Sequence, residues 1–315
     1  MNEQFARDVM HGLSESPKYL PSKYFYDKTG DRLFQEIMEL EDYYLTRCEF
    51  EIFQNSKQEF LNHFLAQSKA FDLIEFGAGD GKKTKVLLEH FMERGADFTY
   101  KPIDISANAL DSLESDLRHG MPQLKLETLQ GEYFSVLSQL DKTSDRTKVV
   151  LFLGSNIGNF LRPVALDFLK QLANTLKKGD MLLLGVDLVK DPTVISKAYN
   201  DSKGITARFN LNLLHRINSE LAANFDLDKF SHFPLYNPIS GTSRSFLISR
   251  ERQTVTIEKL NASFHFKAWE PIHTEYSHKY RLEELDQLAE SSGFETVEHY
   301  FDARKYFTDG IWRLR

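Results

Sequence analysis

Glycine and acidic residues gather where one predicted strand ends. Residues 75–81 read EFGAGDG and overlap the end of the short apolar run 71–76. Glycine after a strand allows positive φ angles and lets the backbone approach a ligand closely. A strand, a glycine turn and then a helical run, here 84–91, is an arrangement that binds nucleotide-type cofactors. We therefore expect this turn to bind a cofactor.

The spacing of the glycines separates the possible cofactors. Nicotinamide and flavin sites carry G-x-G-x-x-G, whereas Gly77, Gly79 and Gly81 give G-x-G-x-G, with Glu75 two residues before the first glycine. A phosphate-binding P-loop is excluded, because no G-K-[ST] follows at the required spacing. The pattern is similar to that of S-adenosylmethionine-dependent methyltransferases with a Rossmann-like sheet. A glycine turn without a ligand stays open on this motif alone.

Two further strand ends carry residues suited to the same cofactor. Asp104 lies at the end of the second predicted strand, and Glu132 and Tyr133 follow the third. In a doubly wound sheet, the acid after the second strand lies beside the glycine turn and can accept hydrogen bonds from both ribose hydroxyls. Glu132 can bind the adenine amino group, and Tyr133 can flank the ring. Together these positions favour S-adenosylmethionine over a turn without a ligand.

The elements that position these residues alternate between strand and helix. Such alternation predicts βαβ crossovers and a mostly parallel sheet that is covered on both faces. The last two strands are close enough in sequence to form a hairpin, so the final strand should be antiparallel. This feature is typical of the methyltransferase class and not of the dehydrogenases. The predicted strands are 71–76, 98–105, 124–130, 148–154 and 181–188, and the predicted helices are 47–66, 84–91, 109–117, 163–177 and 282–293.

The alternation is interrupted between about residues 189 and 277. Helical patterns near 193–203 and 208–223 precede strand-like runs at 243–249, 254–260 and 262–269. The alternation at 254–258 and 262–266 is typical of an antiparallel hairpin. We predict an α/β protein: a Rossmann-like class I methyltransferase sheet with an antiparallel last strand, plus a smaller α+β substrate-binding domain. The predicted boundaries are 48–189 and 280–315 for the cofactor domain, and 1–47 and 190–279 for the substrate domain.

Composition limits the class of protein further. The 315 residues are 41% hydrophobic and 27% charged, and the net charge of −7 argues against a nucleic-acid binder. The single cysteine, Cys48, excludes an intramolecular disulfide and a thiolate metal cluster. No run approaches the roughly 18 apolar residues of a membrane span, and no signal-peptide pattern is found. We expect a cytoplasmic monomer that binds no metal, nucleic acid or membrane.

Longer segments carry a more specific signal. Over nearly its whole length the chain resembles the ergothioneine-pathway L-histidine Nα-methyltransferases, which trimethylate the amino nitrogen of histidine to give hercynine. The resemblance implies a small amino-acid substrate and a substrate domain that caps the cofactor domain. It rests on LPSKYFYDKTGDRLFQEIMELEDYYLTRCE (20–49), FGAGDGKKTKVLL (76–88), FLGSNIGNF (152–160), the motifs within 187–210, and TEYSHKY (274–280).

The resemblance also implies a role for individual residues. Tyr26 and Asn159 match the catalytic contacts to the substrate amine. The other substrate-binding positions are Tyr43 and Tyr199 for the carboxylate, Glu275 and Ser277 for the imidazole, and Gly154 and Thr206 elsewhere in the pocket. The cofactor-binding positions are Gly77, Gly79, Lys83, Asp104, Glu132 and Tyr133.

The expected chemistry is an in-line displacement, in which a neutral amine lone pair attacks a sulfonium methyl carbon. Positioning can supply about 7–11 kcal/mol of the acceleration, without a metal or a covalent intermediate. Solvent or Tyr26 would accept the proton that the ammonium loses before each transfer. Two positions depart from the family, since Asn156 replaces an expected threonine and Ser245 or a neighbour replaces a methionine. Another aromatic amino acid or amine as substrate, or a non-catalytic cofactor-binding protein, therefore remains an alternative.

Overall fold

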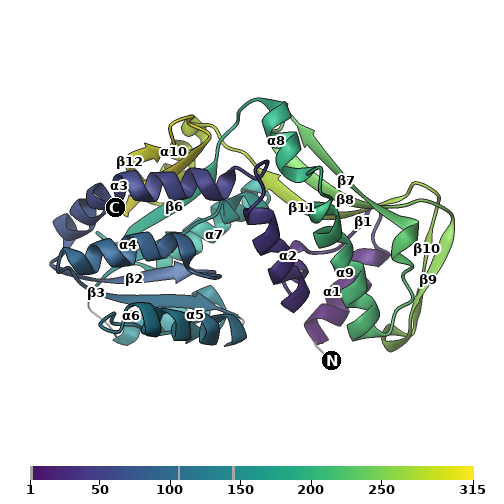
Figure 1. Cartoon of the computed structure of the whole chain (residues 1–315), viewed down its shortest axis with the longest axis horizontal. Helices are drawn as coiled ribbons and strands as arrows, with labels where there is room; N and C mark the ends of the chain where they lie inside the picture. The colour runs from purple at the N-terminus through teal and green to yellow at the C-terminus, as the bar shows by residue number, and fades with distance from the viewer. Residues whose placement is uncertain (1–2, 106, 144–145) are drawn as a thin grey trace. The chain divides into compact units, whose positions relative to one another are not determined.

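The chain forms two compact units in a computed structural model that describes residues 3–105, 107–143 and 146–315. The small-sheet unit comprises Met1–Tyr44 and Lys190–His278, and the large-sheet unit comprises Leu45–Val189 and Lys279–Arg315 (Figure 1). Each unit has its own buried hydrophobic cluster. Which unit binds the cofactor and which the substrate stays a prediction.

The large-sheet unit is built on a seven-stranded sheet among the described residues, in the order β12-β13-β6-β5-β2-β3-β4. Neighbouring strands are parallel except for β13, which runs antiparallel to both β6 and β12. The predicted parallel sheet with an antiparallel last strand is therefore confirmed. The strands are β2 (Ala70–Phe76), β3 (Asp97–Asp104), β4 (Leu129–Gln130), β5 (Thr147–Phe152), β6 (Met181–Asp187), β12 (Phe294–Phe301) and β13 (Phe307–Leu314).

Helices pack on the large sheet, and the central strands β2, β5 and β6 are mostly apolar because both faces are buried. Side chains of α6, α7 and α10 cluster with those of β2, β5 and β6, while α3 packs on β6 and β13 beside α4 (Figure 1). This arrangement places the carboxyl ends of the parallel strands, where the predicted cofactor residues lie, at one edge. The helices are α3 (Leu45–Gln67), α4 (Lys82–Glu93), α5 (Ala107–Gly120), α6 (Tyr133–Thr143), the 3-10 turn η2 (Asn156–Asn159), α7 (Arg162–Thr175) and α10 (Leu282–Ser291).

The small-sheet unit contains a four-stranded sheet in the order β1-β11-β8-β7 and the hairpin β9-β10. The hairpin is antiparallel, as its alternation predicts. The strands are β1 (Lys18–Tyr19), β7 (Phe230–Asn237), β8 (Thr242–Ser249), β9 (Gln253–Ile257), β10 (Ala262–Phe266) and β11 (Pro271–His278). The helices are α1 (Glu3–Ser14), η1 (Ser22–Phe25), α2 (Lys28–Met38), α8 (Pro192–Tyr199), α9 (Ile205–Leu221), η3 (Leu227–Lys229) and η4 (Glu258–Leu260).

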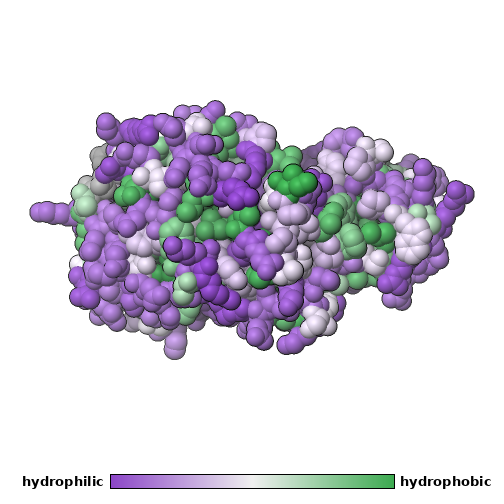
Figure 2. Space-filling model, turned by 90° about the horizontal axis from the view of Figure 1, so that it is seen from above, coloured by the Kyte–Doolittle hydropathy of each residue, from purple (hydrophilic) through white to green (hydrophobic). Residues whose placement is uncertain are grey.

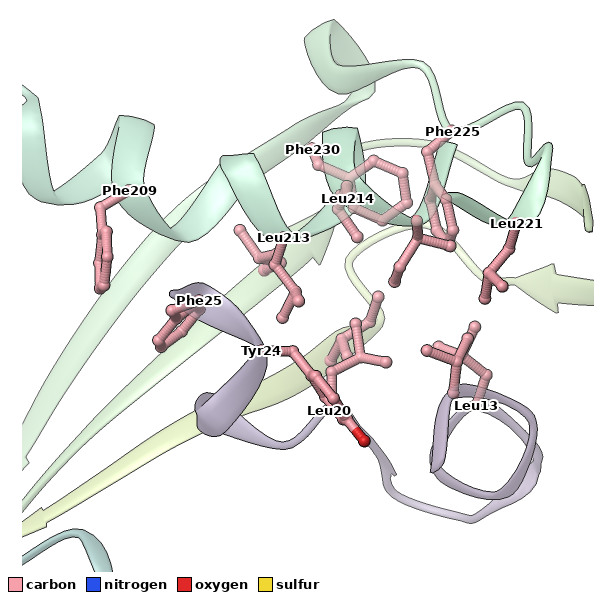
Figure 3. Close-up of a cluster of buried hydrophobic side chains, with 14 of the residues drawn as sticks. Leu13, Leu20, Tyr24, Phe25, Phe209, Leu213, Leu214, Leu221, Phe225 and Phe230 are labelled. Atoms are coloured by element: carbon pink, nitrogen blue, oxygen red, sulfur yellow. The ribbon is translucent and has the colours of Figure 1, made fainter. Parts of the chain in front are cut away.

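The core of the small-sheet unit forms around α9. Phe209, Leu213, Ile217 and Leu221 repeat every four residues, so they lie along one side of the helix, where all four are buried. Figure 3 shows Phe209, Leu213 and Leu221 directed toward side chains of α1 and η1. This packing holds the segment before Tyr26 against α9.

One predicted strand is much shorter than expected, and strands of the small-sheet unit were missed. The strand predicted at 124–130 is only Leu129–Gln130, because the backbone of Lys125 and Glu127 pairs separately with Tyr100. Strands β7 and β11 were not predicted. Pro234 weakens the signal of β7, which is an edge strand, and a register shift after His273 interrupts β11.

The surface is largely hydrophilic on the face that Figure 2 shows, with smaller hydrophobic groups between the polar side chains. Within the described residues, no helix combines the length and the apolar character that a membrane crossing requires.

Candidate active site

The glycine turn follows β2 and adopts a backbone that favours glycine. The φ angles of Gly77, Gly79 and Gly81 are +68°, +55° and +63°. A Cβ atom added at Gly77 would lie 2.9 Å from the phenol oxygen of Tyr133, whereas one at Gly79 would meet no atom within 4 Å. The amide of Gly77 donates to the carbonyl of Ile103, which fixes the turn to β3 at 2.9 Å. The turn thus has open space at Gly79, which fits the close approach of a cofactor.

The residues predicted to bind the nucleoside gather beside this turn. Asp104 ends β3, and its carbonyl accepts the amide of Gly131 at 3.0 Å. Tyr133 is the first residue of α6, and its ring stacks on that of Phe76, with the ring centroids 4.5 Å apart. Burial, together with the charges of Asp104, Glu132 and Glu75, raises the pKa of the Tyr133 phenol to about 12, so it stays protonated at neutral pH. These acids and the aromatic ring suit an adenosine.

Glu75 lies beneath the turn and is almost completely buried. Its carboxylate accepts hydrogen bonds from the hydroxyls of Thr84, at 2.8 Å, and Tyr100. Burial raises the pKa of Glu75 to about 7, although both hydrogen bonds oppose the shift. Glu75 therefore links β2, β3 and α4 at the base of the cofactor residues.

The raised pKa of Glu75 predicts a pH-dependent stability. The folded protein retains a proton that the unfolded chain releases from about pH 4.5, so the free energy of unfolding falls as pH rises to about 7 and then levels. The decrease is about 3 kcal/mol at most. We expect Glu75→Gln to reduce this decrease, as measured by urea unfolding across that range. An unchanged pH profile in Glu75→Gln would contradict the assignment.

Lys83 is tied to the loop that follows β5. Its ammonium, in the first turn of α4, forms an ion pair with Glu49 of α3. The second oxygen of Glu49 accepts the backbone amide of Gly154 at 2.7 Å. Gly154 has a φ angle of +70°, and a Cβ there would lie 3.6 Å from the Lys83 nitrogen. Two predicted site residues, Lys83 and Gly154, are therefore held together by Glu49.

The loop after β5 also carries Asn159. Ser155 has a φ angle of +59°, and its hydroxyl accepts the amide of Asp187 at 3.0 Å, which fixes the loop to β6. Asn159 is half-buried at the end of η2. The N-cap of α7 is Leu161, so Asn159 does not cap this helix.

The predicted imidazole-binding residues lie on β11 in the small-sheet unit. Glu275 and Ser277 are two residues apart and therefore project from the same face of the strand. The Ser245 hydroxyl of β8 donates to Glu275 Oε2 at 3.2 Å, and the Tyr199 phenol donates to Ser277 Oγ at 2.7 Å. Tyr199, predicted to contact a carboxylate, is thus brought to the predicted imidazole site.

Thr206 lies in the first turn of α9 near this group. Its backbone carbonyl accepts a hydrogen bond from the side-chain amide nitrogen of Asn210 at 3.1 Å. The side-chain oxygen of Asn210 accepts one from the hydroxyl of Thr274 at 2.9 Å. These buried hydrogen bonds connect α9 to β11, since Thr274 precedes Glu275. The hydrogen bond at Thr274 therefore holds the backbone beside Glu275 against α9.

Tyr26 and Tyr43, the remaining predicted site residues, contact the same ring. Their centroids lie 5.6 and 6.2 Å from that of Phe34, both edge-on, and Tyr26 also meets Phe209 at 5.8 Å. Tyr26 remains 44% exposed, so its phenol stays accessible. The two tyrosines therefore form one aromatic group, within which packing and ligand contact are compatible.

Some residues of the candidate site have no assigned role from the sequence. Glu49 lies inside the segment that carries the family resemblance, and Ser245 was noted only as a departure from it. Asp309 lies within FTDGIWRL, and an acid in an otherwise buried strand is the signal that could have identified it.

A Rossmann-like sheet with an antiparallel last strand and a glycine turn defines a class I S-adenosylmethionine-dependent methyltransferase. Residues 5–314 match the family described as "Histidine-specific methyltransferase, SAM-dependent", so the chain belongs to that family and uses S-adenosylmethionine. The resemblance found in the sequence is confirmed.

Relatives match over most of the chain. The histidine N-alpha-methyltransferase of Mycolicibacterium smegmatis is 37% identical over 290 residues, which cover 92% of this chain and 88% of that protein. The histidine N-alpha-methyltransferase of Mycobacterium tuberculosis is 34% identical, covering 94% and 90%. Ergothioneine biosynthesis protein 1 of Schizosaccharomyces pombe is 31% identical and covers 89% of this chain, but this match spans only 37% of that protein.

Proposed function

We propose that this protein transfers methyl groups from S-adenosylmethionine to the α-amino nitrogen of L-histidine, three times in succession, to give hercynine. The observation that carries this proposal is the position of Glu275 on β11 in a member of the histidine-specific methyltransferase family. Ser245 donates a hydrogen bond to this acid, and Ser277 follows it two residues later. A carboxylate can accept several hydrogen bonds, and an imidazole N–H is a matching donor for Glu275.

The imidazole would be recognised through both ring nitrogens. Glu275 accepts a ring N–H, and Ser277, whose oxygen already accepts from Tyr199, uses its own proton for the other nitrogen. A site of buried polar groups discriminates strongly, because an analogue without matching groups leaves them unpaired. This pairing favours histidine over amino acids with apolar side chains.

The remaining predicted site residues would bind the amine and the carboxylate of the substrate. When bound, S-adenosylmethionine supplies a methyl group activated by its sulfonium. The carbonyl oxygen of Asn159 accepts an amine N–H and orients the lone pair, and Tyr43 donates to the carboxylate. The phenol of Tyr199, which donates its proton to Ser277, positions this serine for the imidazole. Tyr26 or solvent accepts the proton released before each transfer. These roles rest on the family resemblance and on the residue types.

A second candidate is methylation of another aromatic amino acid or amine. Ser245 contacts Glu275, and this serine or a neighbour replaces the expected methionine. Asn156, which replaces the expected threonine, lies in the loop after β5. Both differences concern segments that carry proposed substrate residues, so they favour a shifted selectivity if histidine fails as a substrate.

Incubation with single amino acids separates these functions. We expect mass spectrometry to show a gain of three methyl groups on L-histidine, with three molecules of S-adenosylhomocysteine formed per molecule of product. The amine acceptor is identified by fragmentation of the product. Trimethylation of tryptophan or tyrosine with histidine unchanged would replace the proposal by the second candidate, and absence of any product would indicate a non-catalytic cofactor-binding protein.

A further inference from the structure

Two buried acids and a half-buried lysine interact in the large-sheet unit. Glu49 of α3 and Asp309 of β13 are both fully buried, and the Lys83 side chain is 21% exposed. Glu49 is bonded to Lys83 through one oxygen and to the Gly154 amide through the other. Asp309 interacts electrostatically with both Glu49 and Lys83. Three side chains from distant parts of the sequence therefore form one charged cluster.

Gly185 of β6 makes room for the two carboxyl groups. Asp309 is its direct partner in the sheet. A Cβ atom at Gly185 would overlap Glu49 Oε1 and lie 3.0 Å from Asp309 Oδ1. Both oxygens therefore lie around the same point above β6. The φ angle of Gly185 is not positive, so the requirement for glycine here is one of space.

The two carboxyl groups have different partners. Within the described ranges, no group donates a hydrogen bond to either oxygen of Asp309. Two neighbouring buried carboxylates cannot both be ionised at low cost, so one retains a proton. Burial and the charge of Glu49 raise the pKa of Asp309 well above its usual range. Burial alone would lower the pKa of Lys83, but the Glu49 carboxylate raises it.

Other titratable groups around the cluster have partners of their own. Glu75, on β2, accepts hydrogen bonds from two hydroxyls, and Asp187, on β6, pairs with Lys279 at 2.8 Å. Tyr300 of β12, opposite Asp309 in the sheet, contacts His63 at 3.0 Å. The acids left to balance the charge of Lys83 are therefore the pair Glu49 and Asp309, which together carry one negative charge.

We propose that Glu49 and Asp309 form an acid pair that shares one proton and one negative charge, and that this pair positions Lys83 and the Gly154 turn for cofactor binding. The inference rests on the proposed role of Lys83 toward the cofactor. Glu49 carries the charge and Asp309 the proton, which it donates toward the carboxylate. If Glu49 is neutralised, Asp309 releases its proton and becomes the counter-ion of Lys83. Both acids act as positioning residues.

The proton is observed directly by labelling aspartate at its side-chain carboxyl carbon with ¹³C. The Asp309 resonance is assigned by its loss in Asp309→Asn. We expect this resonance to report a protonated acid at about pH 7 in the wild type, and an ionised one in Glu49→Gln, because the repelling charge is gone. An ionised Asp309 in the wild type overturns the proposal, as does one that stays protonated in Glu49→Gln.

The positioning role is tested with S-adenosylhomocysteine by calorimetry, without histidine. We expect each single variant, Glu49→Gln or Asp309→Asn, to weaken binding about threefold, and the double variant about 100-fold, because only the double variant leaves Lys83 without a counter-ion. Asp180→Asn is the matched control, since Asp180 is a buried acid at the opposite end of β6 that accepts the Lys148 and Lys177 amides. It should lower the melting temperature and leave the affinity unchanged.

The outcomes separate this inference from the proposed function. If the double variant loses no more affinity for S-adenosylhomocysteine than the product of the two single losses, the acid pair is overturned, even when wild-type histidine methylation proceeds. Wild-type protein that binds S-adenosylhomocysteine but methylates no amino acid contradicts the proposed function alone. If the double variant does not fold, the ¹³C result for Glu49→Gln decides.

Discussion

Glu275→Ala is expected to reduce kcat/KM for histidine trimethylation by about 10³-fold, because a site built around a hydrogen bond to the substrate is left with an unpaired imidazole N–H. Ser245 would also lose its acceptor. Glu275→Gln keeps one carbonyl acceptor but no charge, so its loss should be smaller. Steady-state assays with histidine, coupled to mass spectrometry of the product, measure both variants.

The control for Glu275 is Glu251→Ala in the same unit. Glu251 is exposed, and its ion pair with Lys229 lies at the surface, where such pairs contribute little. We expect wild-type kinetics from this variant. Full activity in Glu275→Ala would contradict the proposed imidazole site, whereas improved methylation of an aromatic amino acid would support its role in selectivity.

Asn159→Ala is expected to lower kcat by about 100-fold or more, because misplacing the attacking atom by a small distance costs that much. The affinity for S-adenosylhomocysteine should be retained, since Asn159 is not among the proposed cofactor residues. Single-turnover rates with histidine and calorimetry with S-adenosylhomocysteine separate the two effects.

Asn62→Ala provides the matched control for Asn159. Asn62 is exposed on α3, where it accepts a hydrogen bond from Gln58 within the helix. Its loss should change neither quantity. Wild-type turnover in Asn159→Ala would remove this residue from the reaction.

The cofactor sheet could be predicted because its signals are local. Buried strands such as 71–76 and 181–188 form apolar runs, and the glycines at 77, 79 and 81 supply the positive φ angles of a local turn. Elements whose stability depends on neighbours were harder to predict. Strand β4 keeps only two residues, and β7 depends on its pairing with β8 despite Pro234.

The sequence by itself determined the family, the cofactor and the order of strands and helices, because these depend on motifs and periodicity along the chain. Only the tertiary structure decided which charged residues meet. Glu49, Lys83 and Asp309 are each an ordinary surface residue by type, yet α3, α4 and β13 bring them together above Gly185. Their protonation depends on burial and on neighbouring charge, and both arise only when the chain folds.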